Sequence, residues 1–180
     1  MTFKEYIQKD REKYEFLHSR KQRLMKMIFR EHEYVIWKFV VLLRKEEFYF
    51  NKGNMLLSGY YRRRKNILGE RLGFTIPKNV FAEGLLVWHY GNIVINAMAR
   101  VGKNCILHGN NCIGNNGKGD NNNNPVIGDN VDIGVGAVVI GDVYIADNVI
   151  IAAGAVVNKS VNEPNVVVAG IPAKIIKRLS

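Results

Sequence analysis

The sequence predicts a chain of two parts, an α-helical N-terminal region followed by a β-solenoid, and three observations carry this prediction. Residues 1–65 place apolar side chains among charged ones at helical spacing. From about residue 75, aliphatic residues recur at every sixth position instead. A stretch in the middle of that repeat, 114–125, contains no aliphatic side chain and predicts a loop.

The helical prediction for residues 1–65 rests on periodicity and on the position of helix breakers. The apolar residues at helical spacing include Leu17, Leu24, Ile28, Val35, Phe39 and Leu42. Such spacing places side chains on one face of a helix. Proline is absent from this region, and glycine occurs only at Gly53 and Gly59, where turns are expected. We therefore expect two or three short helices.

A six-residue period covers the second part of the chain. Its aliphatic position recurs in ten hexads: Ile95, Val101, Leu107, Ile113, Ile127, Ile133, Val139, Ile145, Ile151 and Val157. A small or apolar residue follows four positions later at Ala99, Cys105, Val131, Ala137, Val143, Val149, Ala155 and Val161. This period is typical of a coil that turns a corner every six residues, with one inward aliphatic residue per short strand. A β-sandwich would need turn signals every eight to twelve residues instead.

The two trains of hexads are out of phase, because 14 positions separate Ile113 from Ile127. The segment between them, GNNGKGDNNNNP, must therefore leave the coil as a loop, and its Gly and Asn residues suit irregular backbone. A loop ejected from a regular solenoid is a candidate functional site, and a flexible hairpin without a role is the alternative. We predict a helical region at 1–70, a β-helix at 71–180 and the excursion at about 115–125.

The net charge of +10 is concentrated in the helical region, where residues 1–65 carry 17 Lys and Arg against 8 Asp and Glu. The densest cluster is RRRK at 62–65, and no nucleic-acid motif surrounds it, so we do not expect nucleic-acid binding. A basic surface also suits peripheral association with the inner membrane face. A solvated helical face is the alternative.

The cysteines and the apolar runs indicate the cellular location of the protein and whether it binds a metal. Cys105 and Cys112 make no disulfide framework, and no Cys/His cluster suggests a metal. The first 30 residues are charged throughout, unlike a signal peptide. The longest apolar run, 35–43, contains Lys38 and is too short to span a bilayer. We therefore expect a cytoplasmic protein without a metal.

A histidine interrupts the repeat in GLLVWHYGNIVIN, residues 84–96. Counting six positions back from Ile95 reaches His89 instead of an aliphatic residue, and Trp88 and Tyr90 flank it. An imidazole can accept a proton near neutral pH, and a placed base typically contributes about 10²–10⁴-fold to a rate. A hydrogen-bonded structural histidine is the alternative interpretation.

The other histidines have weaker signals. His108 follows His89 by 19 residues, about one solenoid turn of three hexads, so it is expected about one coil away. There it could assist the base, contact the acceptor or have a structural role. His18 and His32 belong to the charged helical region, and we expect both on the surface.

The hexads, the segment HGNNCIGNNGKG and the closing VVVAGIPAKII resemble the left-handed β-helix hexapeptide-repeat acyltransferases over about residues 70–180. Within that family the chain is most similar to the serine O-acetyltransferase branch and to its relatives that acetylate capsular or lipopolysaccharide sugars. The resemblance implies an all-β left-handed parallel β-helix with a small N-terminal α-helical region. It also implies a homotrimer that binds acetyl-CoA in the groove between neighbouring β-helices.

The same resemblance implies roles for individual residues. GLLVWHYGNIVI matches the segment around the family's general base, which makes His89 the expected catalytic residue. Small-residue turns hold acetyl-CoA in the family, and a backbone N–H there could stabilise the oxyanion. The matching residues here are Asn115, Lys118, Val135, Ala153, Ala169, Gly170 and Lys174. For each lysine, a solvated surface charge is the alternative.

Three departures from the serine enzymes' pattern concern the acceptor. Phe74 stands where those enzymes have an Asp that pairs with the histidine, and Trp88 replaces an acidic residue that contacts serine. Asn123 and Asn124 replace an Arg-His pair that binds the amino acid. A substrate carboxylate favours an arginine partner, so we expect an acceptor other than L-serine. The residue that orients His89 stays open: a backbone carbonyl, Asn92 and Glu83 are the candidates.

Aromatic rings and amide side chains suit a sugar acceptor. The expected substrate-binding residues are Trp88, Tyr90, His108, Asn123 and Asn124. The sequence thus predicts O-acetyl transfer from acetyl-CoA to a hydroxyl of a sugar in surface polysaccharide biosynthesis. The alternatives are a serine O-acetyltransferase of cysteine biosynthesis, sugar N-acetylation and a non-catalytic hexapeptide-repeat scaffold.

Overall fold

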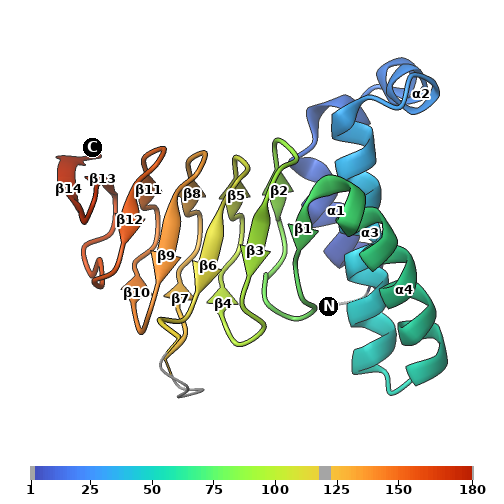
Figure 1. Ribbon diagram of the computed structural model, residues 1–180. Helices are drawn as coiled ribbons and strands as arrows, with labels where there is room; N and C mark the ends of the chain where they lie inside the picture. Colours follow the sequence, from blue (N-terminus) through green and yellow to red (C-terminus); the bar gives the residue numbers. More distant parts are fainter. Residues whose placement is uncertain (1–2, 118–122, 180) are drawn as a thin grey trace.

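The computed structural model describes residues 3–117 and 123–179. It consists of a helical region, here called the cap, that covers one end of a solenoid, and the C-terminus lies at the other end (Figure 1). The helices of the cap are α1 Phe3–Glu12, the 3₁₀ helix η1 Glu15–Leu17, α2 Arg20–Ile28, α3 His32–Asn51 and α4 Met55–Leu72. None of the described helices is long and apolar enough to cross a membrane.

The prediction of two or three short helices is wrong, because α3 has 20 residues and α4 has 18. These two helices form an antiparallel hairpin around Gly53, whose φ of 73° suits glycine. The Asn54 side chain caps α4 by accepting a hydrogen bond from the Leu57 N–H. At the other end of α4, Gly73 adopts φ 76°, and a Cβ there would lie 2.8 Å from the Gly91 carbonyl oxygen. Gly73 thus allows the chain to continue from α4 of the cap into the first coil at close contact with Gly91.

The solenoid consists of three sheets of short, parallel strands. Sheet 1 has the order β1-β3-β6-β9-β12, sheet 2 has β10-β7-β4, and sheet 3 has β14-β13-β11-β8-β5-β2. Their bounds are β1 Phe74–Thr75, β2 Leu86–Val87, β3 Ile93–Ile95, β4 Arg100–Val101, β5 Ile106–Leu107, β6 Cys112–Gly114, β7 Val126–Ile127, β8 Asp132–Ile133, β9 Val138–Ile140, β10 Tyr144–Ile145, β11 Ile150–Ile151, β12 Val156–Val157, β13 Val166–Gly170 and β14 Ala173–Arg178. Among the described strands, only β14 pairs antiparallel, as it folds back on β13.

The predicted β-solenoid is confirmed by its core. All ten aliphatic residues of the hexads are buried, and so are the eight small or apolar residues that follow them. Each buried Val, Leu or Ile contributes about 1.5–3 kcal/mol through removal of its side chain from water. The predicted excursion lies between β6 and β7, with its central residues 118–122 outside the described part of the chain.

An asparagine ladder forms the corner between sheet 2 and sheet 3. Asn104, Asn130, Asn148 and Asn165 all adopt φ 57°, which asparagine tolerates better than most residues. The Asn104 amide nitrogen donates to the Asn130 amide oxygen at 2.9 Å, and Asn130 donates in the same way to Asn148 at 3.0 Å. Each coil therefore sets the position of the next one through its side-chain amides.

The corner that contains His89 is longer than the corner on the next coil. Val87 pairs with Leu107 and Ile95 pairs with Ile113. The first two residues are eight positions apart and their partners are only six apart, so the His89 corner holds two extra residues. This explains why the six-residue count reaches a histidine where an aliphatic residue is expected. Because of the two extra residues, His89 lies exposed at a corner instead of inside the coil.

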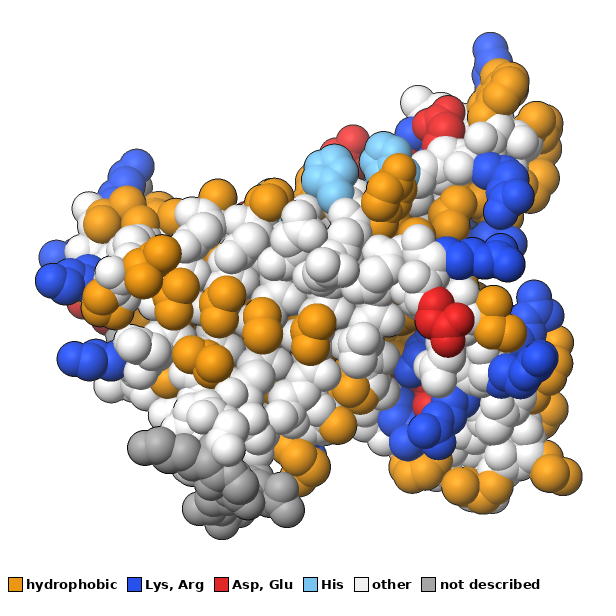
Figure 2. Space-filling view, in the orientation of Figure 1, with side chains coloured by type: hydrophobic (Ala, Val, Ile, Leu, Met, Phe, Trp, Pro, Cys, Tyr) orange, Lys and Arg blue, Asp and Glu red, His pale blue; other side chains and the backbone are white. Residues whose placement is uncertain are grey.

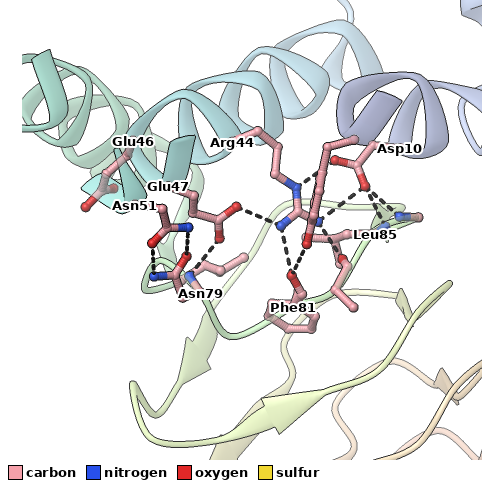
Figure 3. Close-up of polar contacts among 12 residues, drawn as sticks. Asp10, Arg44, Glu46, Glu47, Asn51, Asn79, Phe81 and Leu85 are labelled. Atoms are coloured by element: carbon pink, nitrogen blue, oxygen red, sulfur yellow. Dashed lines mark hydrogen bonds and ion pairs between the residues drawn. The ribbon is translucent and has the colours of Figure 1, made fainter. Parts of the chain in front are cut away.

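A buried ionic network joins the cap to the first coil (Figure 3). The Arg44 guanidinium of α3 donates to both carboxylate oxygens of Asp10, at 2.7 and 3.2 Å, and to Glu47 at 2.9 Å. It also donates to the backbone carbonyls of Phe81 and Ala82. Burial alone would lower the pKa of Arg44, but the charges of Glu47 and Asp10 outweigh it and raise that pKa. We call this set the Arg44 network.

Two tyrosines of the N-terminal segment complete the docking of the cap. The Tyr6 ring lies 4.5 Å from the Arg44 guanidinium carbon, and its hydroxyl donates to the Phe81 carbonyl at 3.0 Å. Burial raises the pKa of Tyr6 to about 12. The buried hydroxyl of Tyr14 accepts a hydrogen bond from the Val87 N–H of β2 at 3.2 Å. Sequence periodicity gives no sign of these contacts.

Candidate functional site

One corner of the solenoid, between sheet 3 and sheet 1, gathers most of the predicted site residues. Because β2, β5, β8, β11 and β13 pair in register, the residues that follow each strand stack along this corner. From the cap outward the stacked pairs are Trp88 and His89, His108 and Gly109, Gly134 and Val135, Ala152 and Ala153, and Ala169 and Gly170. Figure 2 shows histidine side chains at this edge, beside the cap. We call this column the histidine corner.

His89 is exposed and lies against the cap. Its ring stacks on the His32 ring, with centroids 5.6 Å apart and planes at 25°. The Tyr90 ring meets His32 edge-on at 6.1 Å. On the next coil, Gly109 adopts φ 113°, and a Cβ there would lie 3.4 Å from the Cβ of His89. His32, which we expected on the surface, is instead half-buried at the start of α3 and forms part of this site.

Among the described residues, neither Glu83, Asn92 nor a backbone carbonyl forms a hydrogen bond with the His89 ring. Glu83 lies 3.5 Å from the Lys103 ammonium, and the Asn92 N–H donates to Asn110 instead. Phe74 is buried against Phe39, with ring centroids 5.1 Å apart. Within the described part of the chain, the His89 ring is therefore held by its contact with the His32 ring. Tyr90 contacts His32 as well and so belongs to the same cluster of rings.

His108 has the carboxylate partner that His89 lacks. Its Nε2 lies 2.8 Å from Oδ1 of Asp132, which is on β8 of the next coil. On the other side, the Trp88 ring stacks on the His108 ring at 6.1 Å and 23°. His108 thus lies one coil from His89, held between an aromatic ring and a carboxylate. Asp132 was not predicted from the sequence, because the excursion between β6 and β7 separates it from His108 along the chain.

A pocket of about 770 Å³ opens beside Trp88, between the N-terminal segments of the cap and β2. Its lining includes Lys13, Lys21 and the carboxylates of Glu31 and Glu33. Lys26 bridges those two carboxylates, and the hydrogen bonds that it donates to Glu33 and Glu31 raise its pKa. Within the described ranges Lys13 and Lys21 pair with no carboxylate. The pocket therefore presents both signs of charge, and we call it the Trp88 pocket.

Small residues continue the histidine corner away from the cap. Val135 and Ala153 are exposed, and their backbone N–H groups have no hydrogen-bond partner in the described part of the chain. Gly134 leaves room for close stacking, since a Cβ there would lie 2.6 Å from the Ala153 nitrogen. At about 4.8 Å per coil, the column from His89 to Gly170 spans roughly 19 Å. It offers backbone donors to an extended ligand.

The remaining predicted residues lie elsewhere. Asn115, Asn123 and Asn124 flank the excursion at the opposite edge of sheet 1, and Asn124 is buried there. Lys174 is exposed on β14, opposite Ala169 of β13. Lys118 lies outside the described residues. The residues that the structure describes contain no group of three or more His, Cys, Asp or Glu side chains that could hold a metal ion.

Comparison with known proteins agrees with the hexad pattern. Residues 124–159 match the family model described as bacterial transferase hexapeptide, six repeats. A serine acetyltransferase of Synechococcus elongatus is 36% identical over 102 residues, which cover 57% of this chain and 41% of that protein. A serine acetyltransferase of Staphylococcus xylosus is 39% identical over 127 residues, 66% of this chain and 58% of the relative. The chain thus spans about half the length of these relatives.

Solved structures show the same architecture. The crystal structure of serine acetyltransferase in complex with coenzyme A from Brucella abortus superposes with a TM-score of 0.64 at 28% identity, covering 78% of this chain and 55% of that one. Serine acetyltransferase of Neisseria gonorrhoeae superposes over 99% of this chain and 68% of its own, with a TM-score of 0.72 at 23% identity. The second likeness extends over the cap and concerns the fold alone.

Proposed function

We propose that the chain is an acetyl-CoA-dependent serine O-acetyltransferase. The observation that carries this proposal is its similarity, at 34–42% identity, to four curated serine acetyltransferases. The histidine corner supports it, because a candidate base and a column of exposed backbone donors lie along one edge of the solenoid. We further infer that the coil is left-handed, as in the hexapeptide family, and that the protein is cytoplasmic.

The sugar acceptor expected from the sequence is wrong. The curated relatives are serine acetyltransferases, and the superposed crystal structures carry the same name. The expectation rested on three departures: Phe74 in place of an Asp, Trp88 in place of an acid, and Asn123 and Asn124 in place of an Arg-His pair. That reasoning overlooked the charged side chains that the cap brings to the Trp88 pocket, because they belong to a distant part of the sequence.

In the proposed reaction His89 is the general base. Its unprotonated nitrogen takes the proton of the serine hydroxyl while the hydroxyl oxygen attacks the thioester carbonyl of acetyl-CoA. The tetrahedral intermediate then breaks its C–S bond, and the departing thiolate takes the proton from His89 to become the thiol of CoA. His108, held by Asp132, is placed to contact the acceptor. A backbone N–H of the corner would stabilise the oxyanion.

The Trp88 pocket suits an amino-acid acceptor. A zwitterion needs a cation for its carboxylate and a carboxylate for its ammonium group. Lys13 and Lys21 offer the first and Glu31 and Glu33 offer the second, within one pocket beside the histidine corner. In this proposal Trp88 and Tyr90 shape the opening through which serine reaches His89.

A trimer would complete the site for acetyl-CoA. Val135, Ala153, Ala169 and Gly170 belong to the histidine corner, whereas Asn115 and the excursion flank the far edge of sheet 1. One chain cannot bring these two edges together, but a neighbouring copy could place its excursion beside the histidine corner of the first. We therefore retain Asn115, Lys118, Asn123 and Asn124 as proposed contacts of acetyl-CoA or serine across such an interface. Lys174, opposite Ala169 of the histidine corner, is retained as a proposed contact of acetyl-CoA on the same chain.

The proposal is tested by following the CoA thiol released from acetyl-CoA when L-serine is added, with O-acetylserine identified by mass spectrometry. We expect His89→Ala to lower kcat by about 10²–10⁴-fold without changing the affinity for acetyl-CoA. His18→Ala is the matched control, because the His18 side chain is exposed and does not line the Trp88 pocket. Absence of thiol release with L-serine would exclude the proposed acceptor. Failure to bind acetyl-CoA would favour the scaffold alternative.

A further inference from the structure

Helix α2 turns its apolar face to solvent. None of its residues is buried, and Leu24, Ile28 and the adjacent Phe29 are 50%, 58% and 66% exposed. On the opposite side of the helix, Lys26 faces the protein, where it pairs with Glu31 and lies 5.7 Å from the Phe16 ring. This is the reverse of a helix that packs its apolar stripe on a core.

The segment that carries this apolar face is basic. Residues 20–30, RKQRLMKMIFR, contain no Asp or Glu. Of its cations only Lys26 is engaged in an ion pair within the described part of the chain. Arg20, Lys21, Arg23 and Arg30 therefore surround exposed apolar side chains with uncompensated positive charge.

A groove of about 580 Å³ continues this surface between α2, α3 and α4. Its cations are Arg30, Lys38, Arg63, Arg64 and Arg71, and none of its lining residues is acidic. Among described residues, no carboxylate forms an ion pair with any of these five. Figure 2 shows Lys, Arg and hydrophobic side chains intermixed over the cap end of the molecule.

We propose that the outer face of α2 and this groove, together called the cationic face, dock on an anionic lipid bilayer. Lipid phosphates would lie against the groove arginines, while Leu24, Ile28 and Phe29 enter the boundary between headgroups and acyl chains. No described helix can span a membrane, so the protein lies on the surface. A second copy of the chain fits this face poorly, because two such surfaces carry like charges. The proposal is independent of the acetyl-transfer proposal.

The test is flotation of the full-length chain with vesicles of phosphatidylcholine alone or of equal parts phosphatidylcholine and phosphatidylglycerol. We expect binding to the anionic vesicles only. It should weaken between about 0.1 M and about 1 M salt, as the Debye length falls from about 10 to about 3 Å.

Two double variants separate the two components of the face. Arg63→Gln with Arg71→Gln removes two groove charges and should weaken binding by roughly 25-fold, at roughly fivefold per charge. Leu24→Gln with Ile28→Gln keeps the charge and removes apolar contact, and we expect at least a tenfold loss, roughly. The matched control is Lys159→Gln with Lys177→Gln, which removes two exposed charges far from the cap and should bind as the parent does. Circular dichroism and melting establish that each variant is folded.

Several results would overturn the proposal. Equal binding to both vesicle types, or to neither, would exclude an anionic bilayer as the partner. If an oligonucleotide bound as tightly and the Leu24/Ile28 variant bound vesicles unchanged, the attraction would be that of any polyanion. If the Leu24/Ile28 variant instead had a lower molecular mass than the parent by light scattering, the face would be an interface between copies of the chain.

Discussion

The two ends of the molecule are stabilised in different ways. The solenoid interior consists of aliphatic and small side chains repeated on each coil, and its described residues include no buried charged side chain. The cap buries Asp10, Arg44, Glu46, Glu47 and Lys65. Lys65 pairs with Glu46 at 2.8 Å, and the others belong to the Arg44 network.

This difference determines which substitutions destabilise each region. A coil of the solenoid contacts similar coils on both sides, so a change in one coil is supported by its neighbours. The cap has no such repetition, and its position on the first coil depends on a few directional contacts to the carbonyls of residues 81–82. Loss of one charged partner there leaves the other buried and unpaired.

The largest effect should come from Arg44→Ala. It leaves Asp10 and Glu47 buried without their cation, and we expect the free energy of unfolding to fall by about 3–5 kcal/mol. Urea denaturation measures this loss. Arg178→Ala, which removes the exposed pair with Glu163, is the control and should leave the unfolding curve unchanged. A change below 1 kcal/mol for Arg44→Ala, on the order of a surface pair, would contradict the contrast drawn here.

A smaller effect, repeated from coil to coil, is expected for Ile→Val in the solenoid core. Ile133 and Ile151 occupy paired inward positions on neighbouring coils of sheet 3, and Ile145 occupies an inward position of sheet 2. All three are fully buried, and each substitution should lower the free energy of unfolding by about 0.5–1.5 kcal/mol. The losses at Ile133 and Ile151 should agree closely, because these two sites are structurally equivalent. Widely different losses would show that the coils are not interchangeable.

Tyr6→Phe should cost about 1 kcal/mol at neutral pH, because it removes one buried hydrogen bond to Phe81. Burial raises the pKa of Tyr6 from 10.0 to about 12, so the folded state favours the protonated phenol. That contribution is complete below about pH 10 and is lost as the pH rises through about 12. The variant should therefore show a shallower alkaline decline in melting temperature. Burial also raises the pKa of Tyr14, which will retain part of the slope.

The smallest effect is expected at the junction of the two regions. His32→Ala removes the ring that stacks on His89, and we expect a few-fold fall in kcat with KM for acetyl-CoA unchanged. His32→Phe keeps a stacking ring and should restore most of the rate. Equal losses in both variants would mean that contact with a ring does not position His89.

Much of the fold could be predicted from the sequence, because the solenoid repeats an aliphatic residue at every sixth position. Each hexad gives an independent observation of the same inward position, and the phase shift located the excursion. The helices of the cap were harder to delimit, since Gly59 lies within α4 and ends nothing. The Arg44 network could not be predicted, because Asp10, Phe81 and Ala82 are 34 to 38 residues from Arg44 and share no periodicity with it.

The candidate site could be predicted only in part, for the same physical reason. Coil counting places His108 about one coil from His89, whereas Val135 and Ala153 were assigned through the family resemblance. His32 approaches His89 across the junction between cap and solenoid, and Asp132 approaches His108 across the excursion. Neither approach follows from spacing. His32 was missed because it belongs to the cap, and Asp132 was missed because the excursion shifts the six-residue count between its hexad and that of His108.

The asparagine ladder has a consequence for how such a molecule can change in length. Asn130 and Asn148 are separated by 18 residues and adopt the same conformation, so each coil offers the same side-chain amide to the next coil. If that 18-residue unit were duplicated, the coil that follows it would therefore meet the same hydrogen-bonding groups as before. The solenoid can therefore be extended: growth by whole turns would lengthen the histidine corner while leaving the cap unchanged.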